Sequence, residues 1–307
     1  MSLAQYSKPL SLLAKVMLLV VIFWFLLRGV DRAELENMLL AQEHSLLVEA
    51  GILLLVQVFA GAVRWQFVLR ALGAHLSNFR ILILYYISVF FNCCLPGTVG
   101  GDVVRVWQLK AEHIALPLAI SSVVIDRMIA LLALGVMGFV TMPILAGYIG
   151  VSAWVIMPIC GAFGGLILWC LFHLEKLPIL QKIHLLEHLA QSFRLMFSRP
   201  KQAFIGLIMA IMGHSCFCLC AYILATSLDT PITAAETFTL IPWVLLISII
   251  PLSIGGWGLR EGAMVAMLAL AGIPKIAAIT ISVQIGLLLI IISLPAGVLW
   301  LFNRGKK

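Results

Sequence analysis

Two stretches of the sequence decide the fold: Leu95–Arg105 reads LPGTVGGDVVR, and Ile250–Arg260 reads IPLSIGGWGLR. Both match the pattern P-x-x-x-G-G-x-x-x-R with identical spacing, and both lie inside apolar sequence. A proline followed by two glycines interrupts a helix. Non-helical backbone persists at membrane depth only where it is buried in protein or lines a wet cavity. Interrupted segments at matching positions of two halves are typical of a transporter's binding site.

The composition predicts an all-α polytopic membrane protein. The chain is 63% hydrophobic and 11% charged over 307 residues, whereas soluble domains are about 25% charged. The net charge of +7 comes from Lys and Arg placed between apolar runs rather than on one face, so nucleic acid is not an expected partner. The sequence contains no Walker loop, nucleophile elbow or dinucleotide fingerprint, and we expect no cofactor.

The apolar runs predict eight membrane segments. Two segments, 81–106 and 234–272, are each interrupted by one copy of the motif. We expect these two to form broken or re-entrant helical hairpins. Six further runs are long enough for a full span: 10–27, 46–68, 114–148, 151–172, 203–226 and 276–302.

The basic residues predict the orientation of these segments. The segment 31–49 is acidic and should be external, whereas 173–202 and the carboxyl terminus are basic and should be cytoplasmic. Counting crossings from a cytoplasmic amino terminus places the two hairpins on opposite sides of the membrane. We therefore expect an inverted-topology repeat, with residues 1–150 and 151–307 as its halves. The stretch 176–200 should be an amphipathic cytoplasmic helix that links them.

The repeated motif combines helix breaks with cationic groups, which favours an anion site. A half-helix that starts after the glycines presents free N–H groups and the positive end of its dipole, and an arginine about one turn further adds a forked cation suited to phosphate. The alternative is helix packing by small residues with snorkelling arginines. The residues of this prediction are Pro96, Gly100, Gly101 and Arg105 in the first copy, and Pro251, Gly255, Gly256 and Arg260 in the second.

Further charged residues lie in predicted membrane segments. Asp126 and Arg127 are about ten residues into a span, roughly 15 Å deep by helical rise, where ions mark functional pathways by default. A structural ion pair, for instance Asp126 with Arg260, is the alternative. Arg64 reads as an interfacial anchor. Asp102 should cap its helix, and Glu261 follows Arg260 in the second copy only. Four arginines against three acids leave one positive charge, which suits a phosphate-bearing ligand.

A zinc-protease string, His184-x-x-Glu187-His188, lies in the linker. No third ligand is apparent beside it, and a zinc site needs at least three. We therefore expect no metal. His214, inside a span, reads as a packed polar residue.

These motifs also carry a family resemblance. The chain is similar to the membrane region of lysylphosphatidylglycerol synthetases over nearly its whole length. The resemblance implies an inner-membrane, flippase-like protein. Because the soluble synthase domain of the two-part relatives does not follow here, it argues against lysyl transfer. The residues that carry it are Asn92, Leu95, Pro96, Gly97, Gly100, Gly101, Asp102, Arg105, Asp126, Arg127, Ile250, Pro251, Ser253, Gly255, Gly256, Gly258, Arg260 and Glu261.

The sequence therefore favours a translocase-like protein that moves or binds an anionic phospholipid or a lipid-linked sugar. Two alternatives stay open. One is a membrane-embedded enzyme, or a subunit of one, that modifies a lipid or glycolipid headgroup with an acidic residue of the site as base. The other is a scaffold for a lipid synthase or glycosyltransferase. The resemblance implies a lipid synthase or glycosyltransferase as a partner under both alternatives.

Overall fold

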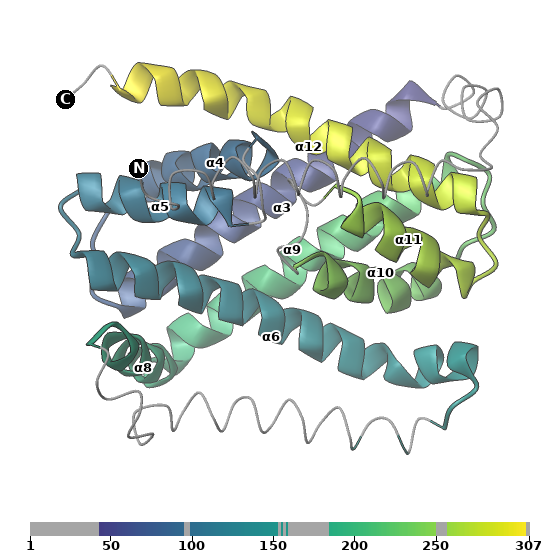
Figure 1. Ribbon diagram of the computed structural model, residues 1–307, viewed down its shortest axis with the longest axis horizontal. Coiled ribbons are helices and arrows are strands. Elements are labelled where there is room, and N and C mark those ends of the chain that lie inside the picture. Colours follow the sequence, from purple (N-terminus) through teal and green to yellow (C-terminus); the bar gives the residue numbers. More distant parts are fainter. Residues whose placement is uncertain are drawn as a thin grey trace, which may run out of the picture. The chain divides into compact units, whose positions relative to one another are not determined.

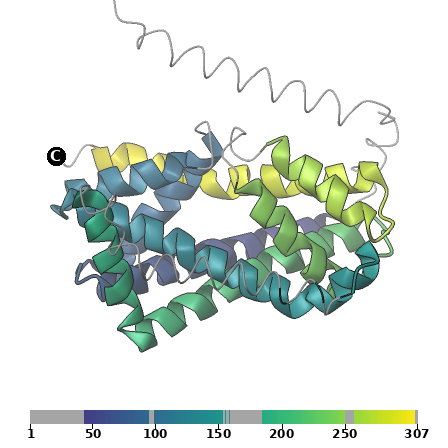
Figure 2. The same ribbon diagram turned by 60° about the horizontal axis from the view of Figure 1, so that its bottom comes forward.

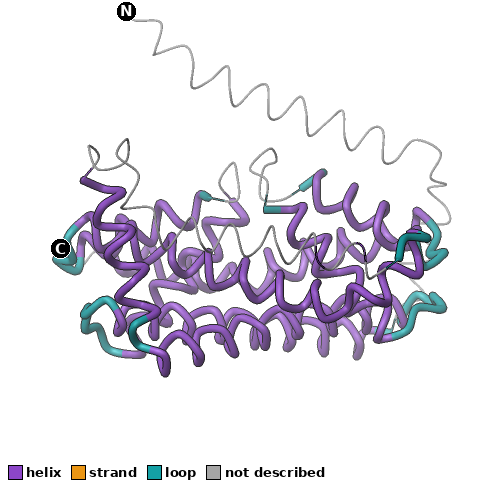
Figure 3. Tube along the Cα trace, turned by 90° about the horizontal axis from the view of Figure 1, so that it is seen from below, coloured by secondary structure: helices purple, strands orange, loops and turns teal. Residues whose placement is uncertain are grey.

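The computed structural model describes residues 43–94, 99–152, 155, 158, 184–249 and 257–304, and its described part consists of helices and loops (Figures 1 and 3). The helices are α3 (His44–Ala71), α4 (Asn78–Cys94), α5 (Gly100–Ala111), α6 (Leu116–Ile149), α8 (His184–Phe197), α9 (Pro200–Thr226), α10 (Ala234–Ser248), α11 (Leu259–Ala269) and α12 (Lys275–Arg304).

Within the described residues, four helices are long and apolar enough to cross a membrane: α3, α6, α9 and α12. They coincide with four of the six predicted spans, and α4 and α10 are shorter apolar helices. The all-helical, polytopic character expected from composition is thereby confirmed. The predicted spans 10–27 and 151–172 lie outside the described residues.

Each copy of the motif separates two short helices. Helix α4 ends at Cys94 and α5 begins at Gly100, while α10 ends at Ser248 and α11 begins at Leu259. A long helix precedes each pair and another follows it, so the order long, short, short, long occurs twice, as α3–α6 and as α9–α12. The break that the prolines predict is present in both copies. Pro96 and Pro251 themselves lie outside the described residues.

The chain forms two compact units. The central unit comprises Val56–Ser88 and Asp102–Cys216, and the carboxyl-terminal unit comprises Met1–Leu55, Val89–Gly101 and Phe217–Lys307. Each unit therefore takes residues from both halves of the sequence. The division into an inverted repeat of 1–150 and 151–307 stays a prediction.

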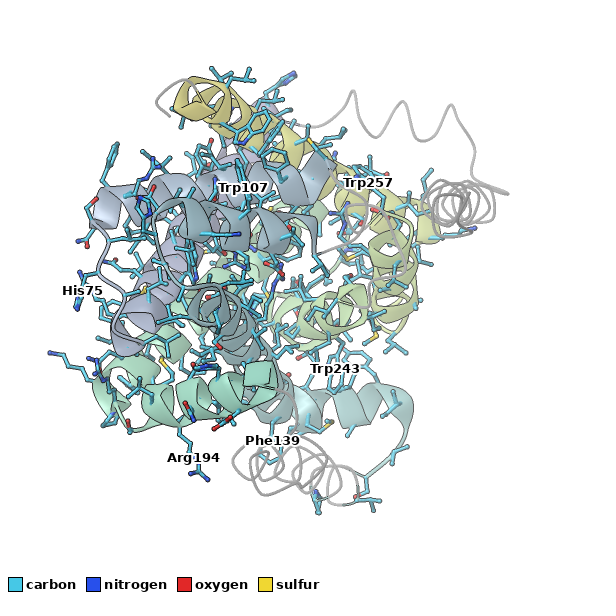
Figure 4. The ribbon with its side chains drawn as sticks, turned by 60° about the vertical axis from the view of Figure 1, so that its left-hand side comes forward. His75, Trp107, Phe139, Arg194, Trp243 and Trp257 are labelled. Carbon is cyan, nitrogen blue, oxygen red and sulfur yellow. The ribbon has the colours of Figure 1, made fainter. Side chains whose placement is uncertain are left out.

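In the central unit, α8 packs against α6 (Figure 2). Its buried face is formed by Ala190, Phe193 and Met196, and Met196 joins an apolar core built from α3, α6 and α9. Arg194 points away from the helix (Figure 4). The amphipathic pattern of the predicted linker thus forms a helix that buries one face and exposes the other.

In the carboxyl-terminal unit, α11 lies beside α10 and α12 (Figure 1). A capping box starts α10, because Thr233 and Glu236 exchange side-chain and backbone hydrogen bonds. The end of α4 also belongs to this unit: Phe91 meets Trp300 of α12 edge to face, with ring centroids 5.1 Å apart. This contact holds the end of α4 against α12.

Candidate functional site

Asp126, fully buried on α6, joins three helices of the central unit. Its carboxylate accepts hydrogen bonds from Arg64 of α3, with Nε at 2.6 Å and a terminal nitrogen at 3.1 Å. It also accepts one from Arg105 of α5 at 2.8 Å. A carboxylate shared by two guanidinium groups holds α3, α5 and α6 at a fixed point, because either cation loses its partner if a helix moves.

Asp102 extends this arrangement. It accepts hydrogen bonds from Arg105 and from Arg127, whose Nε and terminal nitrogen lie at 2.8 and 3.1 Å. The five side chains form a row of alternating sign, which we call the charge ladder: Arg64, Asp126, Arg105, Asp102 and Arg127. Three arginines against two aspartates leave the ladder one positive charge.

The ladder runs from the interior toward the surface. The Arg105 side chain is 3% exposed, whereas that of Arg127 is 40% exposed. Burying an ion costs several kcal/mol unless it is paired and hydrogen-bonded, and the pairing satisfies the inner members of the ladder. Of the five side chains, that of Arg127 is the most exposed.

Aromatic rings cover Arg105 on α5. The rings of Trp65 and Tyr85 each lie 5.2 Å from its guanidinium carbon, a distance at which a cation is attracted to the ring face. Two buried donors in this region, Nε of Arg105 and Nε1 of Trp65, find no acceptor among the described residues. Two buried acceptors of this unit, Oε1 of Gln57 and Oε1 of Gln108, likewise find no donor among the described residues.

A glycine makes room for one of these rings. A Cβ atom at Gly61 would overlap the Tyr85 hydroxyl oxygen. We expect Gly61→Ala to displace Tyr85 from Arg105 and to destabilise the protein by about 1–3 kcal/mol, the usual cost of overpacking. The measurement is the temperature at which detergent-solubilised protein loses its monodisperse elution peak.

Gly135→Ala is the matched control for this prediction. Gly135 lies inside α6 with no atom within 4 Å of an added Cβ, and alanine favours a helix over glycine by about 1 kcal/mol. We expect Gly135→Ala to leave the transition temperature unchanged or higher. Equal temperatures for the two variants would contradict the packing role of Gly61.

The second motif copy builds a separate cluster in the carboxyl-terminal unit. Arg260 donates to Glu261 at 2.9 Å and to the Ser282 hydroxyl at 3.0 Å. That hydroxyl donates in turn to Glu261 at 2.9 Å. The Trp257 ring lies 5.1 Å from the Arg260 guanidinium carbon. One arginine against one glutamate makes this cluster neutral, and Glu261 is fully buried.

At each helix start one N–H group binds a side chain of the protein, and the predicted anion pockets stay a prediction. At α5, the Gly101 N–H donates to the Asn92 side chain at 2.9 Å. At α11, the Gly258 N–H donates to Glu261, and the left-handed φ of 86° at Gly258 favours glycine there. The protein's own side chains thus occupy these donors. Asp102, expected to cap its helix, lies in the first turn of α5 and binds arginines instead.

Two interpretations from the sequence, on Asp126 and on Arg64, need correction. Asp126 pairs with Arg64 and Arg105, not with Arg260. Arg64 is not an interfacial anchor, because it is buried beside Asp126. A charge pair occurs in both motif copies, since Arg105 binds Asp102 just as Arg260 binds Glu261.

Sequence reasoning missed Tyr85 and Ser282 as members of the two clusters. An aromatic residue or a serine inside an apolar run carries no signal of its own, because such residues are common in membrane helices. Arg64 did carry a signal in the sequence, because an arginine within an apolar span is rare and marks a functional site by default.

The remaining candidates are placed as follows. Gly100 and Gly101 form the first turn of α5, while Pro96, Pro251, Gly255 and Gly256 lie outside the described residues. His214 contacts the Ala130 carbonyl oxygen at 3.1 Å, in keeping with a packed polar side chain. In the described part of the chain, no three His, Cys, Asp or Glu side chains are grouped to hold a metal ion.

Comparison with known proteins agrees with the resemblance seen in the motifs. The family described as the lysylphosphatidylglycerol synthase TM region matches residues 12–297. No curated protein matches the sequence. Because the family match covers nearly the whole chain, this multi-pass membrane protein belongs to the lysylphosphatidylglycerol synthase TM-region family.

Proposed function

We propose that this protein is a lipid translocase-like protein that moves or binds an anionic phospholipid or a lipid-linked sugar. The charge ladder is the observation that carries the proposal. Charged side chains inside membrane helices are expensive and are kept where they serve transport or binding. A ladder with one surplus positive charge favours a ligand with a phosphate group, which arginine recognises through paired hydrogen bonds.

The proposal includes the topology expected from the sequence. Six full spans and two re-entrant hairpins would form an inverted repeat in the inner membrane, with both termini in the cytoplasm. The recurrence of a broken helical pair between long helices supports this arrangement. A lipid synthase or glycosyltransferase is the proposed protein partner, because it would supply or consume the lipid.

Reconstitution tests the function directly. Purified protein is placed in phospholipid vesicles that contain trace phosphatidylglycerol with a fluorescent acyl chain, and dithionite then quenches the label in the outer leaflet. Without movement, about half of the signal is protected. We expect the protein to expose the protected half, since a polar path through the membrane lowers the cost of moving the headgroup.

Vesicles without protein, and vesicles with an unrelated multi-pass protein, are the controls. Mass spectrometry of the recovered lipids separates the alternatives. Unchanged lipid masses with loss of the protected signal support translocation. New lipid masses would favour headgroup modification, and a protected signal equal to that of empty vesicles would contradict movement of this lipid.

A further inference from the structure

We propose that Arg70, Arg199 and Lys201 form a docking site for the phosphate group of an anionic phospholipid, whose acyl chains lie along α9. We call these three residues the basic triad. The site is separate from the charge ladder and goes beyond the proposed function, because it holds a surface lipid whether or not the protein moves lipid across the membrane. A vesicle assay without movement would therefore leave the basic triad untouched.

The triad lies where two membrane-crossing helices of the central unit meet at their ends. Arg70 is in the last turn of α3. Arg199 precedes the first residue of α9, and Lys201 is the second residue of that helix. A terminal nitrogen of Arg199 donates to the Arg70 backbone carbonyl oxygen at 3.1 Å, which joins the end of α3 to the start of α9 (Figure 1). Since membrane-crossing helices end at the level of the lipid headgroups, the triad lies at the depth of lipid phosphates.

The triad is cationic and exposed. All three residues are exposed, and in the described part of the chain none of them forms a salt bridge with a carboxylate. Glu112, at the end of α5, is bound by Arg80 instead, with the arginine Nε at 2.8 Å. Basic residues at a membrane surface attract anionic headgroups. Three such cations therefore favour a lipid with a net negative charge over a zwitterionic one.

The two arginines of the triad are held in place. A terminal nitrogen of Arg70 donates to the Asn78 side chain at 2.9 Å, and the Phe67 ring lies 5.5 Å from the Arg70 guanidinium carbon. Arg199 is held by the Arg70 carbonyl oxygen. A guanidinium group has five N–H donors, so each arginine keeps donors for a phosphate, which arginine recognises through paired hydrogen bonds. Basic residues that only orient a chain in the membrane need no such fixed geometry.

The exposed face of α9 favours a lipid over a free phosphate ion. Phe204 and Ile208 follow Lys201 by three and seven residues, so the three side chains lie on one face of the helix. Phe204 is 64% exposed and Ile208 is 42% exposed. Because α9 is long and apolar enough to cross a membrane, this apolar face meets acyl chains. Inorganic phosphate would gain no such contact.

Lipid binding is measured on the detergent-purified protein by native mass spectrometry, with phosphatidylglycerol and phosphatidylcholine of identical acyl chains as probes. We expect wild-type protein to bind phosphatidylglycerol about tenfold more tightly than phosphatidylcholine. Arg70→Gln and Arg199→Gln should each weaken phosphatidylglycerol binding about fivefold, which corresponds to about 1 kcal/mol. Arg199→Lys should retain part of the binding, because lysine keeps the charge but not the fork.

Lys110→Gln is the matched control for charge, since Lys110 is an exposed residue in the last turn of α5 and its loss changes the net charge equally. It should leave phosphatidylglycerol binding unchanged. Phe204→Ser tests the acyl-chain contact, and it should weaken binding of both lipids because it removes apolar area and no charge. Phe139→Ser is its control, because Phe139 is exposed on another membrane-crossing helix, α6 (Figure 4).

All variants are first shown to elute as monodisperse protein, and Arg199→Lys keeps the test informative if Arg199→Gln does not fold. Equal binding of the two lipids by wild-type protein, or phosphatidylglycerol binding that is insensitive to both glutamine variants, overturns the inference. Equal weakening by Lys110→Gln would show a general effect of surface charge and would overturn it as well. Displacement of phosphatidylglycerol by an equal concentration of inorganic phosphate would assign the triad to the free ion. A co-purifying protein that is lost from the glutamine variants while lipid binding persists would assign the triad to that protein instead.

Discussion

Asp126→Asn is expected to destabilise the protein by about 3–5 kcal/mol, the usual cost of removing one partner from a buried ionic network. Asparagine has nearly the shape of aspartate, so the change removes charge and little volume. Arg64 and Arg105 both lose their buried carboxylate. The ladder then holds three arginines against one aspartate, and two of these arginines, Arg64 and Arg105, are buried. We expect little monodisperse protein after extraction, and a lower transition temperature in what remains.

Asp229→Asn is the control for this substitution. Asp229 is exposed in the turn after α9 and has a φ of 52°, a conformation that asparagine adopts readily. It should leave the yield and the transition temperature unchanged. The double variant Arg64→Met with Asp126→Asn should recover part of the loss, because it removes one unpaired cation. A transition temperature of Asp126→Asn equal to wild type would show that the ladder does not stabilise the fold.

Glu261→Gln is expected to have the second largest effect, again about 3–5 kcal/mol. Glu261 accepts hydrogen bonds from Arg260, Ser282 and the Gly258 N–H. Glutamine can keep one or two of these contacts, but it leaves the Arg260 guanidinium buried without a counter-ion. The measurement is thermal unfolding of the purified variant in detergent, which is monitored as loss of the monodisperse elution peak.

Glu187→Gln on the exposed face of α8 is the matched control, and it should change stability by no more than about 0.5 kcal/mol. A double-mutant cycle isolates the pair, because Arg260→Met combined with Glu261→Gln should cost less than the sum of the single changes. Additive costs would contradict a direct Arg260–Glu261 interaction. Lipid binding by the double variant should match wild type if the charge ladder alone holds the ligand.

Much of the fold could be read from the sequence because membrane helices are long and apolar. The runs 46–68, 114–148, 203–226 and 276–302 coincide with α3, α6, α9 and α12. The breaks could be read as well, because proline and paired glycines disfavour helix in any context. Charge counting also found the surplus of one positive charge, since an ion inside an apolar run is visible without any structure.

The candidate site was predicted less completely. The sequence singled out Asp102, Arg105, Asp126 and Arg127 as charged residues inside the membrane, but the partner it offered for Asp126 in the alternative of a structural ion pair, Arg260, was wrong. Pairing depends on which helix faces which, and one-dimensional spacing contains no such information. For a similar reason the sequence did not show which side chains bind an N–H group at each helix start: Asn92, nine residues before Gly101, and Glu261, three residues after Gly258.

The sequence by itself determined the class of protein, the two helix breaks and the sign of the buried charge, because these follow from residue type and local order. Only the tertiary structure decided that three arginines and two aspartates form one alternating ladder. It also decided that Arg127 is the exposed end of that ladder and that Arg260 is enclosed. The physical reason is that a buried ion takes whichever opposite charge the packing brings within hydrogen-bond distance.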